Sequence, residues 1–154
     1  MFASIGVAKH LSFLLTKYRT VLSKGVFATQ NAGDPPAWDN YEERASHNLL
    51  RDCESFFESP CDMHPVQGWI CNVDLDYFFC RATKEGVART VHMFSYEYVK
   101  HLFTVLKDAI DGGQIAVFTM ALSPECCGGW VNAENLAYEV CDIMDIPFRL
   151  PPAK

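Results

Sequence analysis

Two strand-like apolar runs with a helical pattern between them constrain this 154-residue chain more than any other feature. The first run spans residues 69–79, and the second, residues 114–122, is apolar almost throughout. A continuous apolar run of strand length indicates burial on both faces, which is typical of a parallel sheet. Between the two runs, residues 95–111 repeat apolar side chains at helical spacing, from the potential N-cap Ser95 to the stop at Gly112. This order of elements predicts an α/β fold.

Two further helical patterns flank these runs. Residues 41–57 carry an apolar stripe after a linker at 30–38, and residues 132–144 carry another that ends before Pro147. Helices on both sides of a buried parallel sheet give a three-layer α/β/α architecture. We therefore expect one α/β domain over residues 39–154, with a mainly parallel sheet.

The N-terminal segment 1–33 differs from the rest of the chain in charge. It contains no acidic residue, and its basic residues are Lys9, Lys17, Arg19 and Lys24. Apolar side chains from Ala8 to Leu22 fall on one helical face, which predicts a basic amphipathic helix. Three interpretations stay open: an organelle transit peptide, a helix on a membrane surface, or an ordinary helix with a solvated basic face.

Composition excludes several classes of protein. The net charge of −6 leaves no basic surplus for phosphates, so we expect no nucleic-acid partner. No apolar run reaches the ~18 residues of a membrane span. The seven cysteines are odd in number and form no C-x-x-C pair, which disfavours a structural zinc site and a disulfide framework. Without a secretory signal we expect reduced thiols and a cytoplasmic protein.

Two acids interrupt the first apolar run. Asp74 and Asp76 lie two residues apart, so their side chains share one face of a strand. Like charges at this spacing repel, and burial raises the cost of both charges. A hard divalent cation would remove both problems, whereas a solvent-exposed strand end would avoid them. Residue chemistry alone leaves these two interpretations open.

Residues 72–79 and 121–130 contain motifs, N-V-D-L-D-Y-F-F and A-L-S-P-E-C-C-G-G-W. The first resembles the S-x-D-x-D metal-binding strand of the arginase-like hydrolases, and most closely the D-L-D-Y-F sequence of their peptide arginase branch. The second is similar to the L-S-P-E-x-x-G-G-W loop of that branch. The two motifs stand in the family's order with one helix between them, and the resemblance covers roughly residues 69–145.

The resemblance implies a function and a set of site residues. Such enzymes bind two manganese ions that activate a water for attack on a guanidinium carbon. In the peptide branch the substrate is arginine within a peptide, and the products are ornithine and urea. We therefore expect either an arginine-containing peptide or a small guanidino molecule as the substrate. By motif position Asp74 and Asp76 would be metal ligands. In the wider group an acid that contacts the guanidinium stands where this chain has Ala121, and Glu125 is the nearest acid that would replace it.

The chain also departs from the family pattern. The family's D-x-H-x-D ligand strand has its nearest counterpart in Asp62-Met63-His64, followed by Val66 where the final acid should stand. The chain therefore resembles a short or truncated arginase-like hydrolase, and a homo-oligomer is one way to complete the site. No catalytic residue is assigned. The alternative is a non-catalytic α/β remnant or partner-binding protein with an incomplete metal site.

Overall fold

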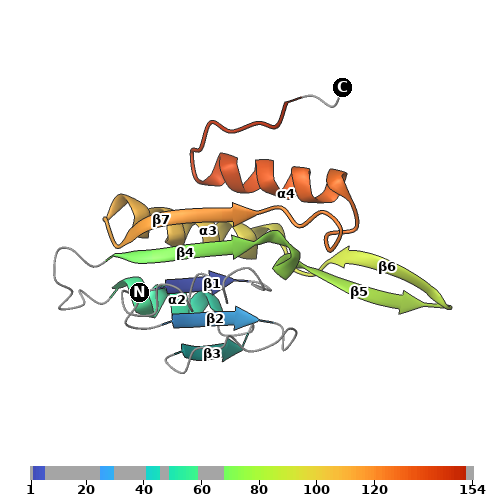
Figure 1. Ribbon diagram of the computed structural model, residues 1–154, viewed down its shortest axis with the longest axis horizontal. Helices are drawn as coiled ribbons and strands as arrows, with labels where there is room; N and C mark the ends of the chain where they lie inside the picture. Colours follow the sequence, from blue (N-terminus) through green and yellow to red (C-terminus); the bar gives the residue numbers. More distant parts are fainter. Residues whose placement is uncertain (1, 6–24, 30–40, 46–48, 59–67, 152–154) are drawn as a thin grey trace, which may run out of the picture.

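The structure, a computed structural model, describes residues 2–5, 25–29, 41–45, 49–58 and 68–151 (Figure 1). Five of its strands form one sheet in the order β3-β2-β1-β4-β7, and every neighbouring pair is parallel. Their bounds are β1 (Phe2–Ile5), β2 (Gly25–Thr29), β3 (Tyr41–Ala45), β4 (Trp69–Asp74) and β7 (Ile115–Ala121). The chain therefore has an α/β fold with a parallel sheet, as the sequence predicts.

The direction of strand addition reverses in the middle of this sheet. The strands β1, β2 and β3 follow one another toward one edge, whereas β4 lies on the other side of β1 and β7 lies beyond it. In open α/β sheets, ligands bind outside the carboxyl ends of the strands at such a reversal point. The carboxyl end of β4 lies beside this point, so its last residue, Asp74, lies where a ligand is expected to bind.

The α-helices of the described residues pack in one hydrophobic cluster with the sheet. Their bounds are α2 (Leu49–Glu58), α3 (Tyr96–Asp111) and α4 (Trp130–Ile143). The helix α3 confirms the prediction for residues 95–111, because the Ser95 hydroxyl accepts a hydrogen bond from the Tyr98 amide at 3.2 Å and caps the first turn. Its stripe of Leu102, Phe103 and Leu106 is buried, and each such side chain contributes about 1.5–3 kcal/mol.

The two faces of the sheet differ in burial. Cys71 and Val73 of β4 are buried in the same cluster as the α3 stripe. Asn72 points to the opposite face, where its Oδ1 accepts a hydrogen bond from the Thr119 hydroxyl at 2.8 Å. Helices α2 and α3 contact each other and cover the first face, and α4 packs against α3. A helical layer on the Asn72 face stays a prediction.

The prediction of one strand over residues 69–79 was wrong at its second half. The strand β4 ends at Asp74, and the 3-10 helix η2 (Leu75–Phe78) follows. The side chain of Asp74 accepts a hydrogen bond from the Asp76 amide and thereby caps η2. Because Leu75, Tyr77 and Phe78 are buried, an apolar run conceals this change from strand to helix.

The connection after η2 was also not predicted as regular structure. It forms an antiparallel hairpin of β5 (Phe79–Lys84) and β6 (Val87–His92). At its tip, Glu85 and Gly86 both have positive φ, 54° and 77°, as a tight two-residue hairpin turn requires.

The helix expected over residues 41–57 was wrong in its first part. Residues 41–45 form β3, which pairs with β2, and helix α2 begins only at Leu49. A helical spacing of apolar residues was thus overridden by pairing in the sheet, which a local pattern cannot show.

The segment 1–33 contributes strands to the same sheet as the rest of the chain. Its described parts, β1 and β2, pair with each other, and β1 pairs with β4. Strands on both sides of the expected division at residues 33 and 39 therefore share one sheet. The amphipathic pattern of residues 8–22 and the linker at 30–38 lie outside the described residues. No helix in the described part of the chain has the length and apolar character needed to cross a membrane.

Candidate metal and substrate site

The two motifs meet at the carboxyl edge of the sheet. Strand register places Asp74, the last residue of β4, opposite Ala121, the last residue of β7. The loop 123–129 therefore starts beside Asp74. Asp74 is only 8% exposed, and no other charged side chain among the described residues is found to be buried. A buried carboxylate at a strand end needs compensation by hydrogen bonds or by a cation.

The second predicted ligand lies in η2 and not on the strand face that the sequence suggested. The Asp76 amide donates to Asp74 Oδ1 at 3.3 Å, so the backbone folds back on the first carboxylate. The Asp76 side chain is partly buried, and its Oδ1 has almost no contact with solvent. Burial raises the pKa of the Cys126 thiol, and the negative charge of Asp76 raises it further, so Asp76 lies near this thiol. The structure thus brings Asp76 close to the loop that carries the second motif.

A compact turn shapes this loop. The amides of Cys126 and Cys127 both donate to the Ser123 carbonyl, at 2.9 and 3.1 Å, and the Gly129 amide donates to the Pro124 carbonyl at 2.8 Å. The Cys127 side chain is buried within the turn, whereas Cys126 is exposed. Glu125, between Pro124 and Cys126, is also exposed. The turn therefore presents Glu125 and Cys126 outward at the edge where the aspartates lie.

The pKa values of the two thiols in this loop reflect the negative charge around them. Burial raises the pKa of Cys127 to about 12, and the negative charges of Asp76 and Asp74 add to the effect. The pKa of the exposed Cys126 is also raised. The largest cause is the partial loss of water around its thiol, followed by the negative charges of Asp76, Asp74 and Glu125. Three carboxylates therefore act on one thiol. A concentration of negative charge at one edge favours a cation, either a metal ion or a guanidinium group.

The hairpin and the loop pack closely at this edge. A Cβ built on Gly128 would lie 2.8 Å from the Thr90 Cβ of strand β6, and Gly128 has φ of +80°. Only glycine fits both the left-handed backbone and this close approach. The amide side chain of Asn132, in α4, donates to the Cys127 carbonyl at 2.9 Å. Loop, hairpin and helix α4 are thus fixed to one another beside Asp74.

The two aspartates fit a hard cation in chemistry but do not complete its coordination. Carboxylate oxygens are the ligands that manganese prefers, and an octahedral ion needs about six donors. No group of three or more His, Cys, Asp or Glu side chains suited to a metal occurs within residues 2–5, 25–29, 41–45, 49–58 and 68–151.

The histidines do not add a ligand in the described part of the chain. His101 pairs with Glu54 at 2.9 Å, and the ring of His92 lies 5.2 Å from that of Phe79. The other three histidines, His10, His47 and His64, lie outside the described residues, as does the Asp62-Met63-His64 segment.

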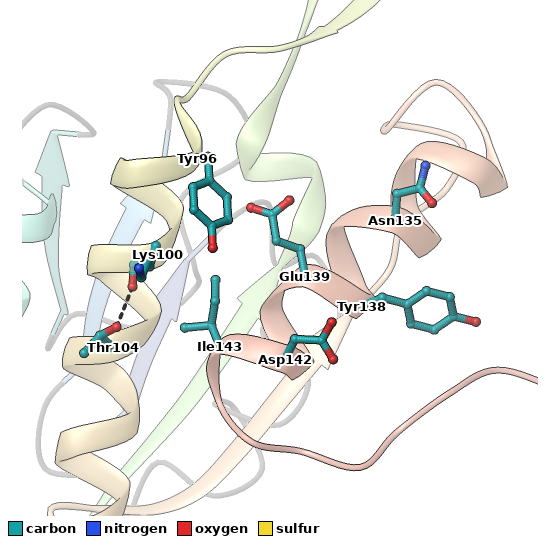
Figure 2. Close-up of a pocket in the computed structure, with 8 residues that line it drawn as sticks. All are labelled: Tyr96, Lys100, Thr104, Asn135, Tyr138, Glu139, Asp142 and Ile143. Carbon is teal, nitrogen blue, oxygen red and sulfur yellow. Dashed lines mark hydrogen bonds between the residues drawn. The ribbon is translucent and has the colours of Figure 1, made fainter.

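A separate groove of about 590 Å³ lies between helices α3 and α4 (Figure 2). Asp74, Asp76 and Glu125 do not line it; its lining residues are Tyr96, Lys100, Thr104, Asn135, Tyr138, Glu139, Asp142 and Ile143. Figure 2 shows the side chains of Tyr96 and Glu139 turned toward each other across the groove. Burial raises the pKa of Glu139, and the nearby His92 opposes that effect. Sequence patterns did not predict this groove, because it depends on how the two helices pack.

Comparison of this chain with protein-family models, with curated proteins and with solved structures found no match.

Proposed function

We propose that this chain is an arginase-like hydrolase that uses manganese to act on the guanidino group of arginine within a peptide. The products are ornithine, left in the peptide, and urea. The proposal includes a three-layer α/β/α architecture of the arginase type, in a short form. It rests on the two motifs that resemble the peptide arginase branch.

One observation carries this proposal. The two motifs are separated by more than 40 residues, yet strand pairing places Asp74, in the first, directly opposite Ala121, in the second. A metal-dependent hydrolase of this kind requires its acidic strand end and its substrate loop at one point, beside the reversal in strand order. A chance resemblance of two segments does not require them to meet.

The chain's own residues have distinct roles in this proposal. Asp74 and Asp76 bind the metal, which when bound supplies an activated water. Glu125 lies outward on the loop and pairs with the cationic guanidinium, which orients its carbon. In the overall reaction a water oxygen bonds to that carbon and the bond to Nε breaks. The leaving nitrogen takes a proton and becomes the side-chain amine of ornithine.

The test is release of urea from arginine-containing peptides by the full chain with and without Mn²⁺. We expect Mn²⁺-dependent release, with ornithine found in the peptide by mass spectrometry. Asp74→Asn should abolish the release, whereas Asp108→Asn, an exposed acid on α3, should not change it. Glu125→Gln should weaken turnover and leave the binding of Mn²⁺ intact. No urea from any arginine peptide in the presence of Mn²⁺ would contradict the proposal.

A second candidate function is a partner-binding α/β protein with an incomplete metal site. It is favoured by the absence of a third metal donor near Asp74 within the described residues. For this candidate we expect no urea from any arginine peptide, with or without weak binding of a divalent ion. Mn²⁺-dependent urea release that disappears in Asp74→Asn would exclude it in favour of the hydrolase.

A further inference from the structure

The hairpin of β5 and β6 extends away from the rest of the fold as an arm (Figure 1). Every residue from 81 to 89 is exposed. The two strands form a sheet of their own, so each has an edge without a neighbouring strand among the described residues. A two-stranded hairpin alone is at best marginally stable in water. Such open edges can accept a further strand from a peptide through main-chain hydrogen bonds.

The arm, defined as residues 79–92, differs in charge from the chain as a whole. It carries three basic side chains, Arg81, Lys84 and Arg89, against one acid, Glu85, in a chain of net charge −6. All three basic side chains are exposed, and the ion pairs found among the described residues do not involve them. The register places Val87 beside Lys84, and strand alternation puts Arg89 on that same face and Arg81 on the opposite one, so both faces of the arm are basic. This surface fits an extended acidic peptide.

The arm begins at the candidate site. Phe79, its first residue, directly follows η2, which contains Asp76. Thr90, near the last residue of the arm, lies against Gly128 of the loop that carries Glu125. A peptide lying along the arm therefore has one end beside the aspartates. At ~3.3 Å per residue, Arg81 lies about 10 Å beyond η2 and Lys84 about 20 Å beyond it.

We propose that the arm binds the peptide substrate as an added strand and selects peptides that carry acidic residues next to the reactive arginine. This inference rests on the proposed function, since it assigns the substrate class of that site. From the spacing along the arm, the preferred acids lie about three to six residues from the arginine. The acidic body of the chain disfavours a nucleic-acid strand on the same arm.

The test is the binding of fluorescent decapeptides to the full chain, followed by anisotropy. Each peptide has one arginine, followed by Asp and Glu in one version and by Asn and Gln in the other. We expect the acidic version to bind about tenfold or more tightly, and the difference to shrink with added salt. The measurement is made in EDTA and repeated with Asp74→Asn. Neither change should alter the preference for the acidic peptide. The binding test is therefore independent of whether the chain has hydrolase activity.

Charge reversal on the arm should remove the preference. The triple variant Arg81→Glu, Lys84→Glu, Arg89→Glu is expected to bind both peptides alike. If that variant fails to fold, Lys84→Glu alone is expected to weaken binding of the acidic peptide about threefold or more. The control for Lys84→Glu is Lys100→Glu, an exposed base on α3 with the same change in net charge, which should bind like the original chain.

Three outcomes would overturn the inference. Equal binding of the acidic and neutral peptides would show that the arm does not select charge. A dimer in solution that dissociates on charge reversal would assign the arm to a second copy of the chain. Tighter binding of a single-stranded oligonucleotide than of the acidic peptide would assign it to nucleic acid.

Discussion

Replacement of Gly128 by alanine tests how the arm packs on the site loop. The new Cβ would lie 2.8 Å from the Thr90 Cβ, and φ at this position is +80°. A left-handed backbone costs a residue with a Cβ about 1–2 kcal/mol. Overpacking against a neighbour costs a further ~1–3 kcal/mol. We therefore expect Gly128→Ala to lower the free energy of unfolding by about 2–5 kcal/mol.

Gly113 provides a matched control. Its φ is +73°, yet a Cβ built there meets nothing within 4 Å. Gly113→Ala should therefore carry the backbone cost alone, about 1–2 kcal/mol. The assay is urea unfolding followed by circular dichroism. In thermal melts, each kcal/mol of lost stability corresponds to a decrease of about 2–4 °C in Tm for a chain of this size. Placing Gly128→Ala in a Thr90→Gly background should bring its cost toward that of the control, with the 3.2 Å approach to Asn132 Nδ2 remaining. Equal losses for Gly128→Ala and Gly113→Ala would refute the close contact between the arm and the loop.

Three further predictions concern the site and the core. Bound Mn²⁺ at about 100 times its Kd should raise the free energy of unfolding by ~2.7 kcal/mol, and thermal melts should show no such gain in Asp74→Asn. Iodoacetamide mapping should label the exposed Cys126 and spare the buried Cys127; because the Asp76 charge raises the Cys126 pKa, Asp76→Asn should move the onset of its labelling to lower pH. Phe103→Ala, at a fully buried side chain, should cost about 3–5 kcal/mol in urea unfolding.

The parts of the fold that sequence patterns predicted have clear local signals. Helix α3 has Ser95 as its cap and Gly112 at its end, and β7 is a continuous apolar run. At η2 the prediction failed because burial surrounds the segment on all sides. At η2, Leu75 and Phe78 are as buried as the strand residues before them, so hydrophobicity does not distinguish a 3-10 turn from a strand. The hairpin did have a local signal that the prediction did not use. Gly86 follows Glu85 at the turn, and glycine readily adopts the positive φ that a two-residue hairpin turn requires.

The candidate site was predictable in its residues more than in its geometry. Asp74 and Asp76 stood out because acids are costly in an apolar run. The pairing of β4 with β7 then brings Asp74 opposite Ala121, which strand–helix–strand order suggests but does not fix in register. The approach of Cys126 to Asp76 depends on the turn at Ser123 and on packing of the arm, and no local pattern encodes it.

The most direct test of the central claim is a crystal of the full chain soaked in Mn²⁺, with anomalous scattering used to locate the ion. We expect a manganese peak between the carboxylates of Asp74 and Asp76, at the carboxyl end of β4 and beside the loop 123–129. Carboxylate oxygens should lie about 2.2 Å from the ion, as octahedral coordination by oxygen requires. A peak elsewhere on the molecule with none at Asp74, or no peak at saturating Mn²⁺, would contradict the assignment of these aspartates as metal ligands.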